Sequence, residues 1–97
     1  MKNIRLTEVY SAGNGSQKQY SLRQIYINPD HVVCLREEEI LKRMLSEGRL
    51  IDGLDQRQNF TRVTVNNNST QQDILVIGTL EEVYKKLHIE TKNLLRG

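Results

Sequence analysis

The sequence predicts a mainly β fold: a small five-stranded antiparallel sheet, bent or closed into a barrel, with an inserted helix and a C-terminal helix. Three observations lead to this prediction. Apolar and polar residues alternate in several short segments, which is the period of a half-buried strand. Turn-forming residues separate these segments. Two further segments repeat apolar residues at helical spacing instead. With 97 residues, the chain is expected to form a single small β domain, 1–97.

Five strands are expected, over residues 4–9, 20–27, 32–35, 60–65 and 73–77. The Gly-rich segment Ser11–Gln17 is expected to form the tip of a first hairpin, because glycine adopts positive φ readily. Asn28, Pro29 and Asp30 are typical of a tight turn, which predicts a second hairpin between strands 20–27 and 32–35. The polar segment 66–72, with three asparagines, predicts a third reversal. From this arrangement we expect Val63, Ile74, Val76 and Leu87 in the core.

Two helices are expected. In 37–47, apolar residues fall on one stripe, Gly48 suits the C-terminal end, and Glu37–Glu39 suit the positive end of the helix dipole. Residues 49–59 are expected to form an ordered loop with room for one helical turn. Thr79 and Glu82 have the spacing of a capping box, which predicts a helix that starts at Leu80 and either continues or frays over 88–97.

Composition argues against several classes of protein. The net charge is +2, and acidic clusters interrupt the basic residues, so the chain lacks the strongly basic character of many nucleic-acid-binding domains. No apolar run approaches the ~20 residues that span a bilayer. The N-terminus lacks a signal-peptide pattern, and Cys34 has no second cysteine to pair with. A cytoplasmic protein with no membrane association and no cofactor is expected.

No residue pattern indicates catalysis or metal binding, so we expect no enzyme, no catalytic residue and no metal site. His31 and Cys34 would face opposite sides of an extended strand, and His88 lies far along the chain. Cys34 has apolar neighbours, which is typical of an inert, buried thiol. The Gly-rich segment 11–17 lacks the Lys-Ser or Lys-Thr pair of a phosphate-binding loop.

Arginines inside predicted strands are the most notable surface groups. Arg23 and Arg62, with Tyr26, are the candidate nucleic-acid-binding residues, because arginine grips phosphates and tyrosine stacks on bases. The alternative interpretation is that Arg5, Arg23 and Arg62 protect sheet edges from uncontrolled pairing. Both interpretations remain open at this point.

The segments Tyr26–Val33, Phe60–Val65 and Ile74–Val83 resemble small flagellar-operon proteins of the FlbD/SwrD type. The shared features are an Asn-Pro-Asp turn after a strand, a strand pair, and a valine-rich strand followed by a Glu-Glu-Val helix. The pattern is also similar to uncharacterised phage proteins, and the expected strands are similar to those of an Sm-like barrel. The first two resemblances imply no catalytic residues, and the Sm-like one implies rings and RNA binding.

The expected function is a non-enzymatic, self-associating protein-interaction module, with an Sm-like RNA-binding protein as the alternative. A homo-oligomer is expected because a small open sheet leaves unpaired edges. In it, the strand arginines would pair with Glu8, Glu37 or Asp73 of a neighbouring subunit. The apolar residues Leu50, Ile51 and Leu54 are expected to form a patch that a second subunit covers.

Overall fold

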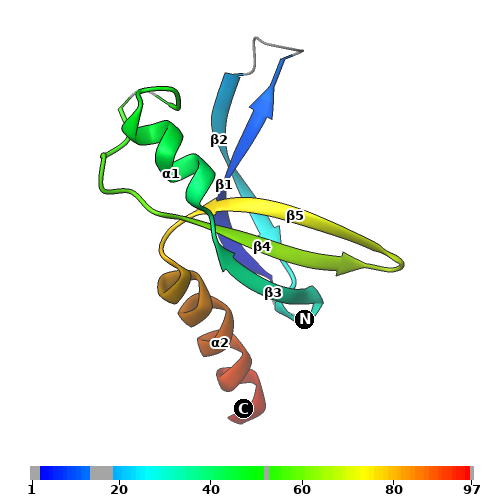
Figure 1. Cartoon of the computed structure of the whole chain (residues 1–97). Coiled ribbons are helices and arrows are strands. Elements are labelled where there is room, and N and C mark those ends of the chain that lie inside the picture. Colours follow the sequence, from blue (N-terminus) through cyan, green and yellow to red (C-terminus); the bar gives the residue numbers. More distant parts are fainter. Residues whose placement is uncertain (1–2, 14–18, 52, 97) are drawn as a thin grey trace.

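The computed structural model contains one five-stranded antiparallel sheet, in the order β2-β1-β5-β4-β3, and two helices (Figure 1). The structure describes residues 3–13, 19–51 and 53–96, with side chains of the last helix described as far as His88. The strands are β1 (Ile4–Ala12), β2 (Gln19–Ile27), β3 (Val32–Glu37), β4 (Phe60–Asn67) and β5 (Thr70–Ile77). The predicted mainly β class is confirmed. The sheet is open, and β2 and β3 are its edges.

The link between β2 and β3 differs from the expected hairpin. A short 3₁₀ helix, η1 (Pro29–His31), follows Asn28, whose side-chain oxygen accepts a hydrogen bond from the Asp30 amide at 3.0 Å. This helix carries the chain from one edge of the sheet to the other instead of reversing it beside β2. The predicted pairing of these strands is therefore wrong, although the turn residues were located correctly.

The other two hairpins form as expected and are longer. β1 pairs with β2 along its whole length without a register shift. β4 and β5 extend into the polar segment, so the reversal itself is only Asn68 and Ser69, with Asn68 at φ 62°. Positive φ is tolerated by asparagine better than by most residues. Most of the predicted Gly-rich tip, 14–17, lies outside the described residues.

Both predicted helices are present, as α1 (Glu39–Ser46) and α2 (Leu80–Arg96). Gly48 follows α1 at φ 70°, the left-handed conformation expected of a helix-ending glycine. The capping box of α2 is complete. The Glu82 amide donates to Thr79 Oγ1 at 3.0 Å, and the Thr79 amide donates to Glu82 Oε1 at 2.9 Å. The segment after Leu87 continues the helix to Arg96.

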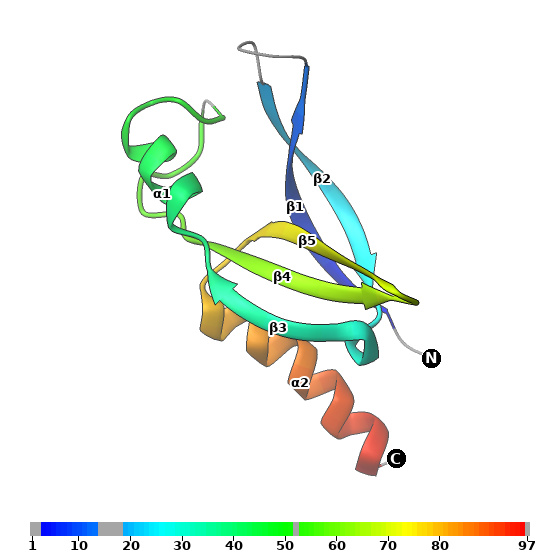
Figure 2. The same cartoon turned by 45° about the vertical axis from the view of Figure 1, so that its right-hand side comes forward.

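The two helices cover opposite faces of the twisted sheet (Figure 2). On one face α2 packs on a cluster that we call the α2 core: Ile4, Leu6, Ile27, Val63, Val65, Val76, Val83 and Leu87. On the other face α1 packs on a smaller cluster, the α1 core: Val9, Leu41, Leu45 and Phe60. Val63, Val76 and Leu87 are buried as predicted, whereas Ile74 is only partly buried against the α2 core.

The loop 49–59 does not present the expected apolar patch. Leu50, Ile51 and Leu54 are each partly buried and pack against the α1 core of their own chain. They therefore do have local partners, because α1 and Phe60 provide an apolar surface that is distant in sequence. No helical turn forms in the described part of this loop.

Candidate functional site

A groove runs between edge strand β3 and helix α2. It has a volume of about 950 Å³ and is lined mainly by apolar side chains, among them Val32, Leu35, Leu80, Tyr84 and Leu87. The antiparallel alternation of β3 explains this lining, since Leu35 lies opposite Val63 of the α2 core and so faces α2. The groove is thus a gap at the margin of the α2 core that the chain leaves open.

Two exposed apolar residues mark the rim of the groove. Val33 is 52% exposed and Tyr84 is 49% exposed. The register of β3 shifts between Val32 and Cys34, so Val33 is the extra residue of a β-bulge and has no partner on β4. The Tyr84 ring lies 4.0 Å from the His88 ring, measured between centroids. Tyr84 is one of the apolar residues at helical spacing in 80–87, whereas nothing in the sequence singled out Val33.

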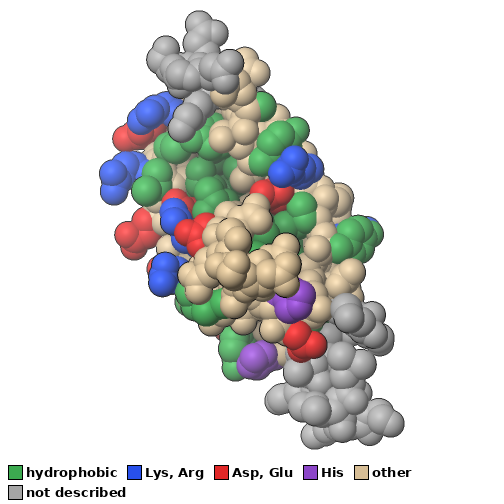
Figure 3. Space-filling view, turned by 90° about the vertical axis from the view of Figure 1, so that its right-hand side faces the viewer, with side chains coloured by type: hydrophobic (Ala, Val, Ile, Leu, Met, Phe, Trp, Pro, Cys, Tyr) green, Lys and Arg blue, Asp and Glu red, His purple; other side chains and the backbone are tan. Residues whose placement is uncertain are grey.

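The groove has an acidic rim. Asp30 and Glu37 contribute carboxylates, and a third carboxylate, that of Glu81, forms an ion pair with Lys85 at 3.2 Å. No lysine or arginine lines the groove within the described part of the chain. On the face in Figure 3, most Lys and Arg side chains lie along the left-hand side with Asp and Glu side chains between them, away from the two histidines. An apolar groove with this rim favours a ligand that is apolar in its centre and basic at its ends.

Next to the groove lies a smaller depression of about 380 Å³, which shares Glu37, Thr79 and Leu80 with it and adds Glu39 and Lys42. The Lys42 ammonium donates to the carbonyl oxygens of Gln56 and Gln58, at 3.3 and 2.8 Å, so it is engaged within the chain. Beyond the end of β3, the surface therefore carries both a further carboxylate, Glu39, and the Lys42 ammonium.

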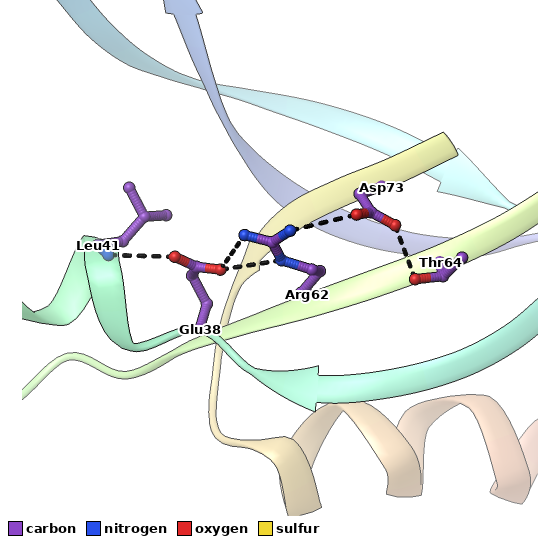
Figure 4. Close-up of polar contacts among 5 residues, drawn as sticks. All are labelled: Glu38, Leu41, Arg62, Thr64 and Asp73. Atoms are coloured by element: carbon purple, nitrogen blue, oxygen red, sulfur yellow. Dashed lines mark hydrogen bonds and ion pairs between the residues drawn. The ribbon is translucent and has the colours of Figure 1, made fainter. Parts of the chain in front are cut away.

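One side chain of the Glu37–Glu39 run points inward instead. The Glu38 carboxylate accepts hydrogen bonds from Nε and Nη2 of Arg62 at 3.0 and 2.7 Å, and one from the Leu41 amide at 3.3 Å (Figure 4). Nη1 of Arg62 also donates to Asp73, at 3.2 Å. The bonds to Glu38 raise the pKa of the Arg62 guanidinium. This network fixes the start of α1 to β4 and β5.

The three candidate nucleic-acid-binding residues do not gather on one surface. Arg62 is held between Glu38 and Asp73 on the α1 side of the sheet. Arg23 pairs with Glu8 at 2.7 Å and lies over the Tyr10 ring, 4.3 Å from its centroid. Since strand residues alternate, Arg23 and Tyr26 point to opposite faces of β2. Tyr26 is 66% exposed.

The strand arginines also bear on the edge-protection interpretation. Arg5 and Arg62 lie on the interior strands β1 and β4, so they protect no edge, whereas Arg23 lies on edge strand β2. The ion pairs that we expected between subunits, of arginine with Glu8 and with Asp73, form within one chain. Intrachain pairing was available because β1 and β5 bring these carboxylates beside the arginines.

Of the groups considered for catalysis or metal binding, Cys34 and His88 both line the groove, whereas His31 does not. Cys34 is half-buried in β3 and lines the groove, His31 ends η1 and His88 lies on α2. Among the residues that the structure describes, no three His, Cys, Asp or Glu side chains are grouped to hold a metal ion. Nor is any described helix long and apolar enough to cross a membrane.

Comparison with known proteins leaves the family open. No protein-family model, no curated protein sequence and no solved structure matches the chain. The resemblances to small flagellar-operon proteins, to phage proteins and to the Sm-like barrel therefore stay predictions that rest on the sequence motifs.

Proposed function

We propose that this chain is a non-enzymatic protein-interaction module that binds one extended segment of a partner protein in the groove between β3 and α2. The observation that supports the proposal is the position of the groove beside an edge strand. An edge strand presents unpaired backbone N–H and C=O groups, and an extended peptide is the ligand that pairs with them.

The groove suits a single strand better than another sheet. Helix α2 lies beside β3, and the bulge at Val33 interrupts its regular edge. Both features obstruct the edge of a second sheet, while a lone peptide fits in the groove. Its alternate side chains would enter the apolar lining around Leu35, Leu80 and Tyr84.

The rim determines the chemistry of the partner segment. The carboxylates of Asp30 and Glu37 attract lysine or arginine residues that flank the apolar centre of the segment. The same carboxylates repel RNA, whose phosphates would lie close to them. The proposed partner is therefore a basic-flanked, apolar, extended peptide.

This proposal is tested by selecting peptides that bind the purified protein from a library of random nine-residue peptides. Enriched peptides should carry apolar residues flanked by lysine or arginine. A labelled synthetic copy of the best peptide should bind about tenfold more weakly to Val33→Lys, a loss of ~1.4 kcal/mol. Ile40→Lys is the matched control, because Ile40 is similarly exposed, at 58%, and lies on α1 outside the groove.

Two outcomes would overturn the proposal. One is that no peptide is enriched, or that Val33→Lys and Ile40→Lys weaken binding equally. The other is that a single-stranded RNA 12-mer binds instead, with an affinity that falls steeply with salt and that Tyr26→Ala abolishes. The second outcome would establish the Sm-like RNA-binding alternative.

A further inference from the structure

The outer edge of β2 lacks most of the usual protection against strand pairing. β2 has nine residues, contains no proline or lysine, and pairs regularly with β1 without a bulge. β1 is the one element in extensive contact with β2 in the described part of the chain. In Figure 2, β2 lies on the opposite side of β1 from α1. A long, regular, uncovered edge of this kind is a template for another strand.

The charge on β2 is also neutralised. Arg23 is the only charged residue of the strand, and its guanidinium is engaged by Glu8 and the Tyr10 ring. By contrast, the other edge strand, β3, has six residues, a bulge and the adjacent helix α2. Of the two edges, β2 is therefore the one left open to the edge of another sheet.

Two exposed apolar residues on β2 indicate what that partner is. Leu22 is 39% exposed and Tyr26 is 66% exposed, and both point to the same face because they are four residues apart. They lie symmetrically about Gln24. If two copies of β2 pair antiparallel about a twofold axis at Gln24, each Leu22 lies directly opposite Tyr26 of the other copy.

Other symmetric registers are less favourable. An axis at Arg23 would place two arginines directly opposite each other, and like charges in that position destabilise a sheet. An axis at Ile25 would place Tyr26 opposite Gln24 and leave Leu22 opposite Asn28, beyond the strand. Only the axis at Gln24 joins the two apolar residues, and aromatic and aliphatic cross-strand pairs stabilise antiparallel sheets.

We infer that the chain forms a twofold dimer in which the two β2 strands pair antiparallel about Gln24, giving one ten-stranded sheet. This inference goes beyond the proposed peptide groove and does not depend on it. The groove lies along β3, at the opposite edge of each sheet, so both copies keep it open.

Light scattering after size exclusion, over a tenfold dilution series, tests the dimer. We expect a mass twice that of the 11.3 kDa chain. Leu22→Lys/Tyr26→Lys should be a monomer, since lysines would oppose lysines. Leu22→Lys/Tyr26→Glu should remain a dimer, since each lysine would oppose a glutamate. Ile40→Lys is the control and should remain a dimer. Circular dichroism checks that each variant is folded.

Cross-linking tests the register independently. In a Cys34→Ser background, Gln24→Cys should form a disulfide-linked dimer on mild oxidation, because opposite residues in an antiparallel pair lie within disulfide distance. Ser21→Cys, which would oppose Ile27, should not. A monomeric wild-type protein at every dilution overturns the dimer, as does a Leu22→Lys/Tyr26→Lys variant that stays dimeric. Equal cross-linking at positions 21 and 24 overturns the register.

Discussion

Glu38, at the start of α1, and Arg62, in β4, form an ion pair with N–O distances of 2.7 and 3.0 Å, and the Glu38 side chain is only 4% exposed. A carboxylate this deeply withdrawn from water requires its hydrogen-bond donors, since burying a charge without a partner is costly. Arg62 also reaches Asp73 on β5, so one guanidinium connects the inserted helix to two neighbouring strands. The ion pair therefore has a structural role, since it holds α1 against the sheet.

Replacing Arg62 by methionine should therefore destabilise the protein. Breaking a fully buried pair costs ~3–5 kcal/mol, and the partial exposure of Arg62 reduces the expected loss to about 2–3 kcal/mol. Urea denaturation measures the free energy of unfolding. The double variant Glu38→Gln/Arg62→Met should recover part of the loss, because it leaves no buried charge. A single variant as stable as the wild type would show that the pair contributes nothing.

Thr79→Ala should remove the N-cap of α2, with its hydrogen bond to the Glu82 amide, and lower the free energy of unfolding by about 0.5–2 kcal/mol. Thr79→Ser is the matched control, since serine retains the hydroxyl and should restore most of the stability. Chemical denaturation of the three proteins provides the comparison. If the alanine and serine variants are equally stable, the hydroxyl does not act as a cap.

Val76→Ala should cost about 1–3 kcal/mol, because Val76 is fully buried in the α2 core and its loss leaves a small cavity. Val33→Ala removes the same two methyl groups from a site that is 52% exposed, so it should change stability by only a few tenths of a kcal/mol. Denaturant midpoints compare the two variants. Equal effects would contradict the assignment of β5 to the centre of the sheet.

Local signals predicted much of this fold. The alternation over 60–65, the apolar run within 73–77 and the polar segment between them predicted a hairpin. The Thr79–Glu82 spacing predicted a cap that forms with both reciprocal hydrogen bonds. In each case the interacting residues are close in the sequence, so the local residue pattern is enough to predict which residues are in contact. The same reasoning located the turn at Asn28–Asp30, but not the direction in which the chain leaves it.

The parts that sequence reasoning missed depend on contacts between distant segments. Glu38 and Arg62 are 24 positions apart, and only the fold shows that this one glutamate of three points inward. The groove requires both Val33 and Tyr84, which belong to an edge strand and a helix that are separated by three other elements. Periodicity describes the faces of one element at a time, so it predicts neither the sheet order nor the gap beside an edge.

The remaining prediction concerns the dependence of the free energy of unfolding on pH. The Thr64 hydroxyl donates to Asp73 Oδ1 at 2.7 Å and, together with Arg62, holds the pKa of that carboxyl below its ordinary value of 3.8. Because the pKa is lower in the folded state, the carboxylate stabilises the fold above pH 3.8, and this contribution is lost as the pH falls through the depressed native pKa. Asp73→Asn should therefore be less stable than the wild type at neutral pH, and the difference should shrink in acid.

Urea denaturation measures the difference in stability between the wild type and Asp73→Asn. It is repeated at a series of pH values, down to the lowest pH at which the protein is still folded. Thr64→Val retains Asp73 but removes its principal hydrogen-bond donor, so this variant should show a weaker dependence of stability on pH below 3.8 than the wild type. If the gap between wild type and Asp73→Asn stays constant across the series, Asp73 does not titrate differently in the folded and unfolded chains. The contacts with Thr64 and Arg62 would then contribute no acid sensitivity to the sheet.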